Sequence, residues 1–286
     1  MKPDRTAAVM ALAGELKLPE PVLVPLEAAA AGLPWPELPV ARLARPEEAG
    51  DAWKIVEARV PPWPEDNGMV QLAVTLAAGV ETRQYYRRLG IPEEVFWATM
   101  GCIPRFLAET HALLGRWAYD RGFWSWRQTG GLLFRLGTLE FELCTLEGAC
   151  PAGLGRGDAV LSVHIPSDAA LSREELDRAY TLAGRFFTKD ALCPWGPPKA
   201  VVCGSWLLSP ALDALLPEDS GIRRFAGDYR RFYVDEEDDS VYRWLFRVPD
   251  PGAELPEKTT LQRRVKAYLQ RGGKIGMAKG VRSFFS

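Results

Sequence analysis

The spacing of the hydrophobic residues changes along this chain, and the change constrains the fold more than any other feature. Up to about residue 120, hydrophobic residues recur every three to four positions, as in residues 69–90, which is typical of amphipathic helices. After that point they alternate or run together in short segments such as 131–146, which is typical of β-strands. The sequence therefore predicts a helical domain over 1–120 and a sheet domain over 121–286.

The first domain is expected to contain several helices separated by a proline-rich segment. Helical spacing marks residues 4–17, 69–90, 93–100 and 105–120. Residues 20–64 are rich in proline, which lacks the backbone N–H and clashes with the preceding turn of a helix. We therefore expect no long regular element in that segment.

The second domain is expected to follow the order strand–strand–strand–helix–strand–helix–strand–strand. A hairpin turns at Gly137-Thr138, a third strand spans 159–166, and Ser172 caps a helix that leads into a strand within 198–208. A second hairpin is predicted from two hydrophobic runs, RFYV and VYRWLFRV, on either side of the acidic turn DEEDDS, and a basic amphipathic helix follows it.

This order predicts an α+β fold with a mixed, mostly antiparallel sheet. The short connections at both ends require antiparallel neighbours, whereas the helix between the two central strands permits one parallel pair. A sheet of this kind can splay at its parallel pair and expose a cleft. The order resembles that of the GNAT-type N-acyltransferase fold.

Composition excludes several other classes of function. The chain carries 35 basic and 37 acidic residues, so it has no net positive charge that would favour binding of nucleic acid. No stretch approaches the ~20 apolar residues of a membrane span, and Glu15 and Lys17 interrupt any signal peptide, so we expect a cytoplasmic protein. Five cysteines without a CxxC pair and two histidines argue against a metal centre.

From about residue 50 to its end, the sequence resembles a bacterial family that has an N-acyltransferase N-terminal domain and a GNAT-like C-terminal domain. The segments that carry the resemblance are Val163-His164-Ile165-Pro166-Ser167, Phe186-Phe187, Cys203-Gly204-Ser205-Trp206-Leu207-Leu208 and Pro217-Glu218-Asp219-Ser220. The resemblance implies acyl transfer from an acyl-CoA, used as a cosubstrate and not permanently bound, to a small-molecule amine.

The resemblance also implies where CoA would bind. In GNAT enzymes the strand before the central helix bonds the pantetheine, and a glycine-containing loop after it holds the pyrophosphate at the helix N-terminus. Here that loop, residues 166–172, has no glycine and carries Asp168. A glycine- and lysine-containing tail, 272–280, is an alternative phosphate site. The CoA-binding residues predicted on this basis are Ile165, Ser167, Ser172, Cys203 and Lys274.

Two residues are candidates for taking the proton of the amine. His164 lies at the C-terminal end of its predicted strand, beside the expected cleft, where a neutral imidazole can act as a general base. Glu142 shares a strand face with Glu140, so these carboxylates can serve as base or bind a cationic amine. The structural alternatives are a histidine that holds the following turn and a solvated strand face.

The departing thiolate needs a proton, and Ser205 and Tyr229 are the candidate donors. Ser205 and Cys203 share one face of their strand, and pairing with the neighbouring strand can bring either of them near His164. Tyr229 follows the next helix, where many GNAT enzymes carry a proton-donating tyrosine. Each of these residues can instead be a core residue.

The sequence is also compatible with two rival functions. The chain can be a catalytically silent ligand-binding or interaction protein that kept the fold, which the absence of a glycine from 166–171 favours. Alternatively, Cys203 and His164 can form a thiol–imidazole pair that carries an acyl group covalently.

Overall fold

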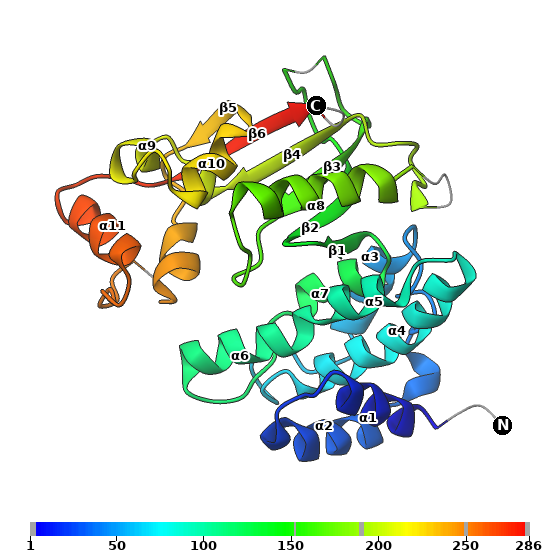
Figure 1. Cartoon of the computed structure of the whole chain (residues 1–286). Coiled ribbons are helices and arrows are strands. Elements are labelled where there is room, and N and C mark those ends of the chain that lie inside the picture. Colours follow the sequence, from blue (N-terminus) through cyan, green and yellow to red (C-terminus); the bar gives the residue numbers. More distant parts are fainter. Residues whose placement is uncertain (1–3, 152, 189–191, 249–250, 284–286) are drawn as a thin grey trace. The chain divides into compact units, whose positions relative to one another are not determined.

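The computed structural model describes residues 4–151, 153–188, 192–248 and 251–283 (Figure 1). The chain divides into two compact units, Met1–Arg135 and Leu136–Ser286. Each unit has its own arrangement of elements and is described separately.

The first unit is a helical bundle built around one long buried helix. Its described α-helices are α1 (Arg5–Glu15), α2 (Glu20–Gly32), α3 (Ala49–Glu57), α4 (Met69–Arg88), α5 (Glu93–Met100), α6 (Cys102–Leu114) and α7 (Gly122–Thr129). Most side chains of α4 from Met69 to Gly79 are buried, and α1, α2, α5 and α7 pack against this helix. The helical character predicted for this part of the chain is confirmed.

The proline-rich segment contains a helix that the sequence analysis did not expect. Helix α2 spans 13 residues, so the expectation that proline prevents a long element there is wrong. Pro21 lies in the first turn, where a backbone N–H has no partner within the helix, and Pro25 removes one further donor. The helix persists because its buried stripe, Val22, Leu26 and Ala30, packs against α1 and α4.

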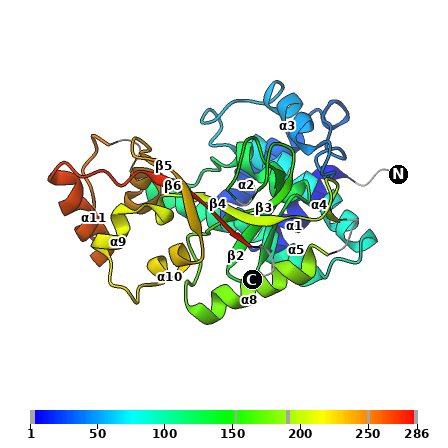
Figure 2. The ribbon, with the colours of Figure 1, turned by 90° about the horizontal axis from the view of Figure 1, so that it is seen from above.

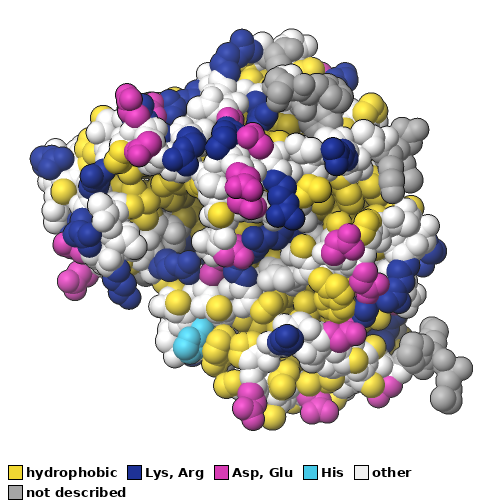
Figure 3. Space-filling model, viewed as in Figure 1, with side chains coloured by type: hydrophobic (Ala, Val, Ile, Leu, Met, Phe, Trp, Pro, Cys, Tyr) yellow, Lys and Arg dark blue, Asp and Glu magenta, His cyan; other side chains and the backbone are white. Residues whose placement is uncertain are grey.

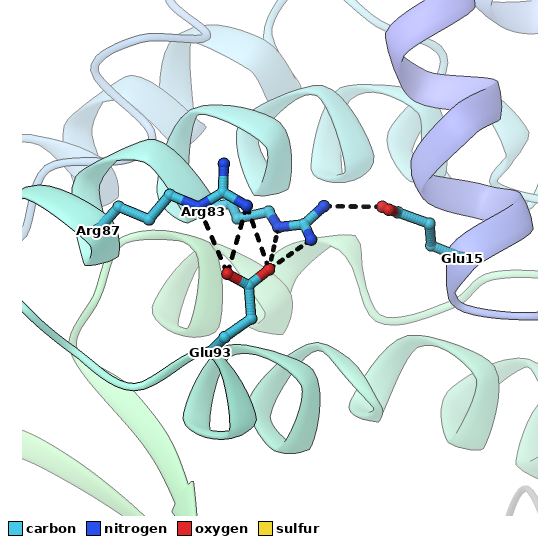
Figure 4. Close-up of polar contacts among 4 residues, drawn as sticks. All are labelled: Glu15, Arg83, Arg87 and Glu93. Carbon is cyan, nitrogen blue, oxygen red and sulfur yellow. Dashed lines mark hydrogen bonds and ion pairs between the residues drawn. The ribbon is translucent and has the colours of Figure 1, made fainter.

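An ion cluster joins three helices of this unit (Figure 4). Arg83 Nη1 donates to Glu15 Oε2 at 2.9 Å, and Arg83 Nε donates to Glu93 Oε1 at 2.6 Å. Arg87 also donates to Glu93, and the Arg83 guanidinium stacks over the ring of Trp97 at 4.5 Å. These contacts link α1, α4 and α5 at the surface of the bundle.

The second unit is built on a six-stranded sheet, whose first strand begins in the first unit. Its strands are β1 (Leu133–Leu136), β2 (Leu139–Thr145), β3 (Ala159–His164), β4 (Ala200–Ser205), β5 (Arg230–Asp235) and β6 (Met277–Ser283). The strand order is β1-β2-β3-β4-β6-β5. The β2–β3, β4–β6 and β5–β6 pairs are antiparallel and β3–β4 is parallel, which confirms the predicted α+β fold with a mixed sheet.

Helix α8 (Arg173–Phe186) connects the two parallel strands and lies along one face of the sheet (Figure 1). It begins as predicted, because the hydroxyl of Ser172 accepts a hydrogen bond from the backbone N–H of Glu175 at 3.3 Å. The shorter helices α9 (Ala211–Leu215) and α10 (Gly221–Gly227) follow β4. Helix α11 (Thr260–Gln270) lies beside α9 near the start of β6 (Figure 2).

The predicted second hairpin is wrong in its second arm. Residues Tyr242–Phe246 form a π-helical turn, because Val241 and Phe246 are buried in a local core with Val265 of α11. The partner of β5 is instead β6, which comes from the glycine-containing tail. Gly280 permits this strand to form, since a Cβ at that position would lie 2.7 Å from the Cβ of Tyr229.

Candidate functional site

Four polar residues lie on one face of the β2–β3 pair. In the antiparallel register Glu140 lies opposite His164, and Glu142 lies opposite Ser162. Residues that face each other across a strand pair project to the same side of the sheet, as do alternate residues of one strand. The sheet therefore brings Glu140, Glu142 and His164 together.

One contact in this group joins the two residues predicted separately as general bases. The Nε2 atom of His164 lies 2.8 Å from Oε2 of Glu142. The side chain of His164 is 26% exposed and that of Glu142 is 14% exposed, whereas Glu140 is buried. The pair is thus partly shielded, with the imidazole as its more accessible member.

His164 also lies beyond the paired part of the two parallel strands. The register between β3 and β4 covers only Leu161 opposite Val201 and Ser162 opposite Val202. The remaining residues of these strands, through His164 and Ser205, are outside the paired register. The splay predicted for the parallel pair stays a prediction, and His164 and Ser205 lie in the part of these strands to which it applies.

Cys203 and Ser205 lie on the opposite face of the sheet from His164. Because Ser162 pairs with Val202, the residues of β4 on the His164 face are Val202 and Gly204. Cys203 is 1% exposed, and burial raises the pKa of its thiol. The hydroxyl of Ser205 accepts a hydrogen bond from the N–H of Leu207 at 3.1 Å and caps the turn after β4. The structure does not bring either residue to His164.

Tyr229 lies on the same face as α8 and forms a pair that the sequence analysis missed. Its hydroxyl is 2.9 Å from the hydroxyl of Tyr180 on α8. Burial raises the pKa of Tyr180 to about 12 and that of Tyr229 well above 10. The guanidinium of Arg282 lies 3.7 Å from the centroid of the Tyr180 ring. The helical spacing of Leu176, Tyr180 and Ala183 could have indicated that Tyr180 faces the sheet.

The loop between β3 and α8 contains three of the residues predicted to bind CoA. Ile165 is half-buried and Ser167 is exposed, while the hydroxyl of Ser172 already accepts the N–H of Glu175. Inside the loop, the N–H of Ala169 donates to the carbonyl of Pro166 at 3.0 Å. The buried hydroxyl of Thr138 accepts the N–H of Ala170 at 2.6 Å, a contact that sequence reasoning missed.

Lys274 lies just before β6 and forms an ion pair with Glu237 in the turn after β5. The hydrogen bond that Lys274 donates to Glu237 raises the pKa of the Lys274 ammonium. The next residue, Ile275, is buried in a local core and its carbonyl accepts the hydroxyl of Ser209. The tail is therefore folded against the sheet, and its lysine already has a carboxylate partner.

Other kinds of site receive no support from the described residues. Within those residues there is no cluster of three or more His, Cys, Asp and Glu side chains that could hold a metal ion. None of the described helices is long and apolar enough to cross a membrane. Basic and acidic side chains are interspersed on the face drawn in Figure 3.

Comparisons with known proteins match both parts of the chain. A family model described as a GNAT-like C-terminal domain matches residues 133–282, and one described as an N-acyltransferase N-terminal domain matches residues 22–131. No curated protein sequence matches the chain.

Solved structures with the same fold are acyltransferases. One, in complex with decanoyl-CoA and teicoplanin, is 26% identical with a TM-score of 0.75, over 96% of this chain and 87% of that one. Another, in complex with CoA and 10C-teicoplanin, is 25% identical with a TM-score of 0.75 over the same shares of both chains.

Proposed function

This chain belongs to the family with an N-acyltransferase N-terminal domain and a GNAT-like C-terminal domain, and we propose that it transfers an acyl group from an acyl-CoA to a primary amine. The family predicted from the sequence is thereby confirmed. The structural neighbours that bind CoA, decanoyl-CoA and teicoplanin support an acyl-CoA donor for this chain. The reaction needs a base for the amine, a site for the thioester and a proton for the thiolate.

The observation that carries the proposal is the contact between His164 and Glu142. When the Glu142 carboxylate accepts a hydrogen bond from Nε2–H, the neutral imidazole keeps its lone pair on Nδ1. The amine nitrogen then attacks the thioester carbonyl and gives its proton to Nδ1 of His164. Glu142 stabilises the imidazolium that results. His164 is therefore the general base, and Glu142 is its positioning residue.

The separated ends of β3 and β4 provide a site for the thioester. Backbone groups from Val163 to Ile165 are outside the β3–β4 register, so they can bond the pantetheine amides or the oxyanion that develops on the acyl carbon. The phosphates then lie toward the loop 166–172, where the first N–H groups of α8 attract an anion. The buried carboxylate of Glu140, opposite His164, favours an acceptor that carries positive charge.

The carbon–sulfur bond breaks as the new carbon–nitrogen bond forms, and the thiolate takes a proton. We assign that proton to Tyr229, which stays protonated at neutral pH because burial raises its pKa. Tyr229 lies on the α8 face, opposite His164, so the amine enters from one face and the thiolate leaves toward the other. Ser205 fits this role less well, because its hydroxyl caps the turn after β4.

The activity is tested by following the release of free CoA thiol from decanoyl-CoA in the presence of a panel of primary amines. The panel contains amino sugars, α-amino acids and polyamines, because the acceptor class is open. We expect thiol release that depends on both the amine and the enzyme, with the acylamide identified by mass spectrometry. Binding of decanoyl-CoA without turnover of any amine would favour the silent binding protein instead.

A further inference from the structure

The loop 166–172 is held in place by the turn between β1 and β2. Thr138, at the end of that turn, is 6% exposed, and its Oγ1 accepts the N–H of Ala170 at 2.6 Å. The turn itself depends on Gly137, which has a positive φ of 67°. Thus a short and well-defined turn fixes a backbone position 32 residues further along the chain.

Helix α10 holds the same loop from another side. A Cβ added to Gly221 would lie 3.0 Å from the Cβ of Leu171 and 3.1 Å from its carbonyl oxygen. The first residue of α10 is therefore in close contact with the backbone that leads into α8. Together with the turn from Pro166 to Ala169, these contacts leave the loop little freedom to change shape.

This rigidity matters because the loop has no glycine. Glycine-rich phosphate loops fold around the anion, since glycine permits the backbone to turn its N–H groups inward. A loop without glycine must instead be held in a shape that leaves the N-terminal N–H groups of α8 accessible. Holding a site in its bound shape lowers the entropy lost on binding.

We propose that Thr138 is a positioning residue for the phosphates of acyl-CoA, acting through its hydrogen bond to Ala170. The proposal rests on the proposed function, because it requires an acyl-CoA donor. It assigns Thr138 an effect on the phosphate-bearing half of the ligand and none on the acyl-pantetheine half.

The test compares two ligands that differ only in the nucleotide and its phosphates. Isothermal titration calorimetry measures the Kd of decanoyl-CoA and of S-decanoyl-pantetheine for the wild type, Thr138→Val and Thr138→Ser. Valine keeps the shape of threonine but removes the acceptor oxygen, whereas serine keeps it. Loss of one hydrogen bond of ordinary strength should raise the Kd of decanoyl-CoA roughly 2- to 12-fold in Thr138→Val. S-decanoyl-pantetheine should bind all three proteins equally, and Thr138→Ser should match the wild type with both ligands.

Equal binding of decanoyl-CoA by Thr138→Val and the wild type would overturn the proposal, as would an equal loss for both ligands. Failure of the wild type to bind decanoyl-CoA would overturn the proposed function itself, and with it this inference. If Thr138→Val does not fold, Thr138→Ala replaces it, because alanine also removes the oxygen that accepts the N–H of Ala170. That variant should show the same selective loss, and an unchanged affinity for decanoyl-CoA would refute the proposal.

Discussion

Glu140 and His164 face each other directly across the β2–β3 pair, yet it is Glu142, two register positions further on, that contacts the imidazole at 2.8 Å. The two carboxylates are thus not equivalent. In the proposed mechanism Glu142 sets the orientation and the tautomer of His164, whereas Glu140 is buried on the same face.

Replacement of Glu142 by glutamine should slow turnover without abolishing it. The amide can present its oxygen to Nε2–H but carries no charge to stabilise the imidazolium. We expect a loss in kcat smaller than the ~10²–10⁴-fold that follows removal of a general base. The measurement is kcat with saturating decanoyl-CoA and amine. Glu140→Gln is the matched variant and should raise KM for a cationic amine more than it lowers kcat; the reverse pattern would contradict the assignment.

Cys203 should be inert toward alkylation in the folded protein. Burial raises the pKa of its thiol, so almost no thiolate is available, and the side chain is 1% exposed. Iodoacetamide followed by peptide mass spectrometry should label Cys203 only after unfolding, while the partly exposed Cys144 is labelled sooner. Rapid labelling of native Cys203, with loss of turnover, would support the covalent thiol mechanism instead.

The pair of Tyr180 and Tyr229 should behave as a unit in stability. Replacing either tyrosine by phenylalanine leaves the other hydroxyl without its partner in a buried position, which costs about 1–3 kcal/mol. The double variant should be less destabilised than the sum of the two single variants, as urea unfolding in a double-mutant cycle can show. Only Tyr229→Phe should also slow thiol release. Strict additivity of the free energies of unfolding would show that the hydroxyls do not interact.

The ion pair of Asp213 and Arg231 should contribute to stability above pH 4 and lose its contribution in acid. Two hydrogen bonds from Arg231, at 2.6 and 2.9 Å, lower the pKa of Asp213 below its unfolded value of about 3.9. A lowered pKa means that the contribution is complete above the unfolded pKa and disappears as the pH falls through the folded pKa. Asp213→Asn should therefore be less stable than the wild type at pH 7, and the difference should shrink as the pH falls through the folded pKa of Asp213. A difference in melting temperature that is independent of pH would contradict this account.

Local signals were sufficient to predict most of the sheet. The hairpin at Gly137-Thr138, the strand that ends at His164 and the helix capped by Ser172 each depend on residues close together in the chain. Strand β6 was missed because its sequence, MAKGVRS, has no alternation of hydrophobic and polar residues. It is a strand only because β4 and β5 pair with it on both sides, and pairing of that kind leaves no local pattern.

The site shows the same division between local and long-range information. His164 and Glu142 could be named from their own strands, but their contact depends on the register of β2 against β3. Likewise, the alternation within β4 showed that Cys203 and Ser205 share a face, but not which face. That choice is fixed by pairing Ser162 with Val202, across a connection that includes all of α8.

The most direct test of the account is the turnover of His164→Ala with decanoyl-CoA and an active amine. If His164 is the general base, the variant should melt at the temperature of the wild type and lose about 10²–10⁴-fold in kcat. His111→Ala is the matched control, because His111 stacks on Trp117 in the other unit, and it should keep wild-type turnover. Wild-type turnover in His164→Ala, or its loss only through unfolding, would contradict the account and leave His164 as a residue that holds the turn after β3.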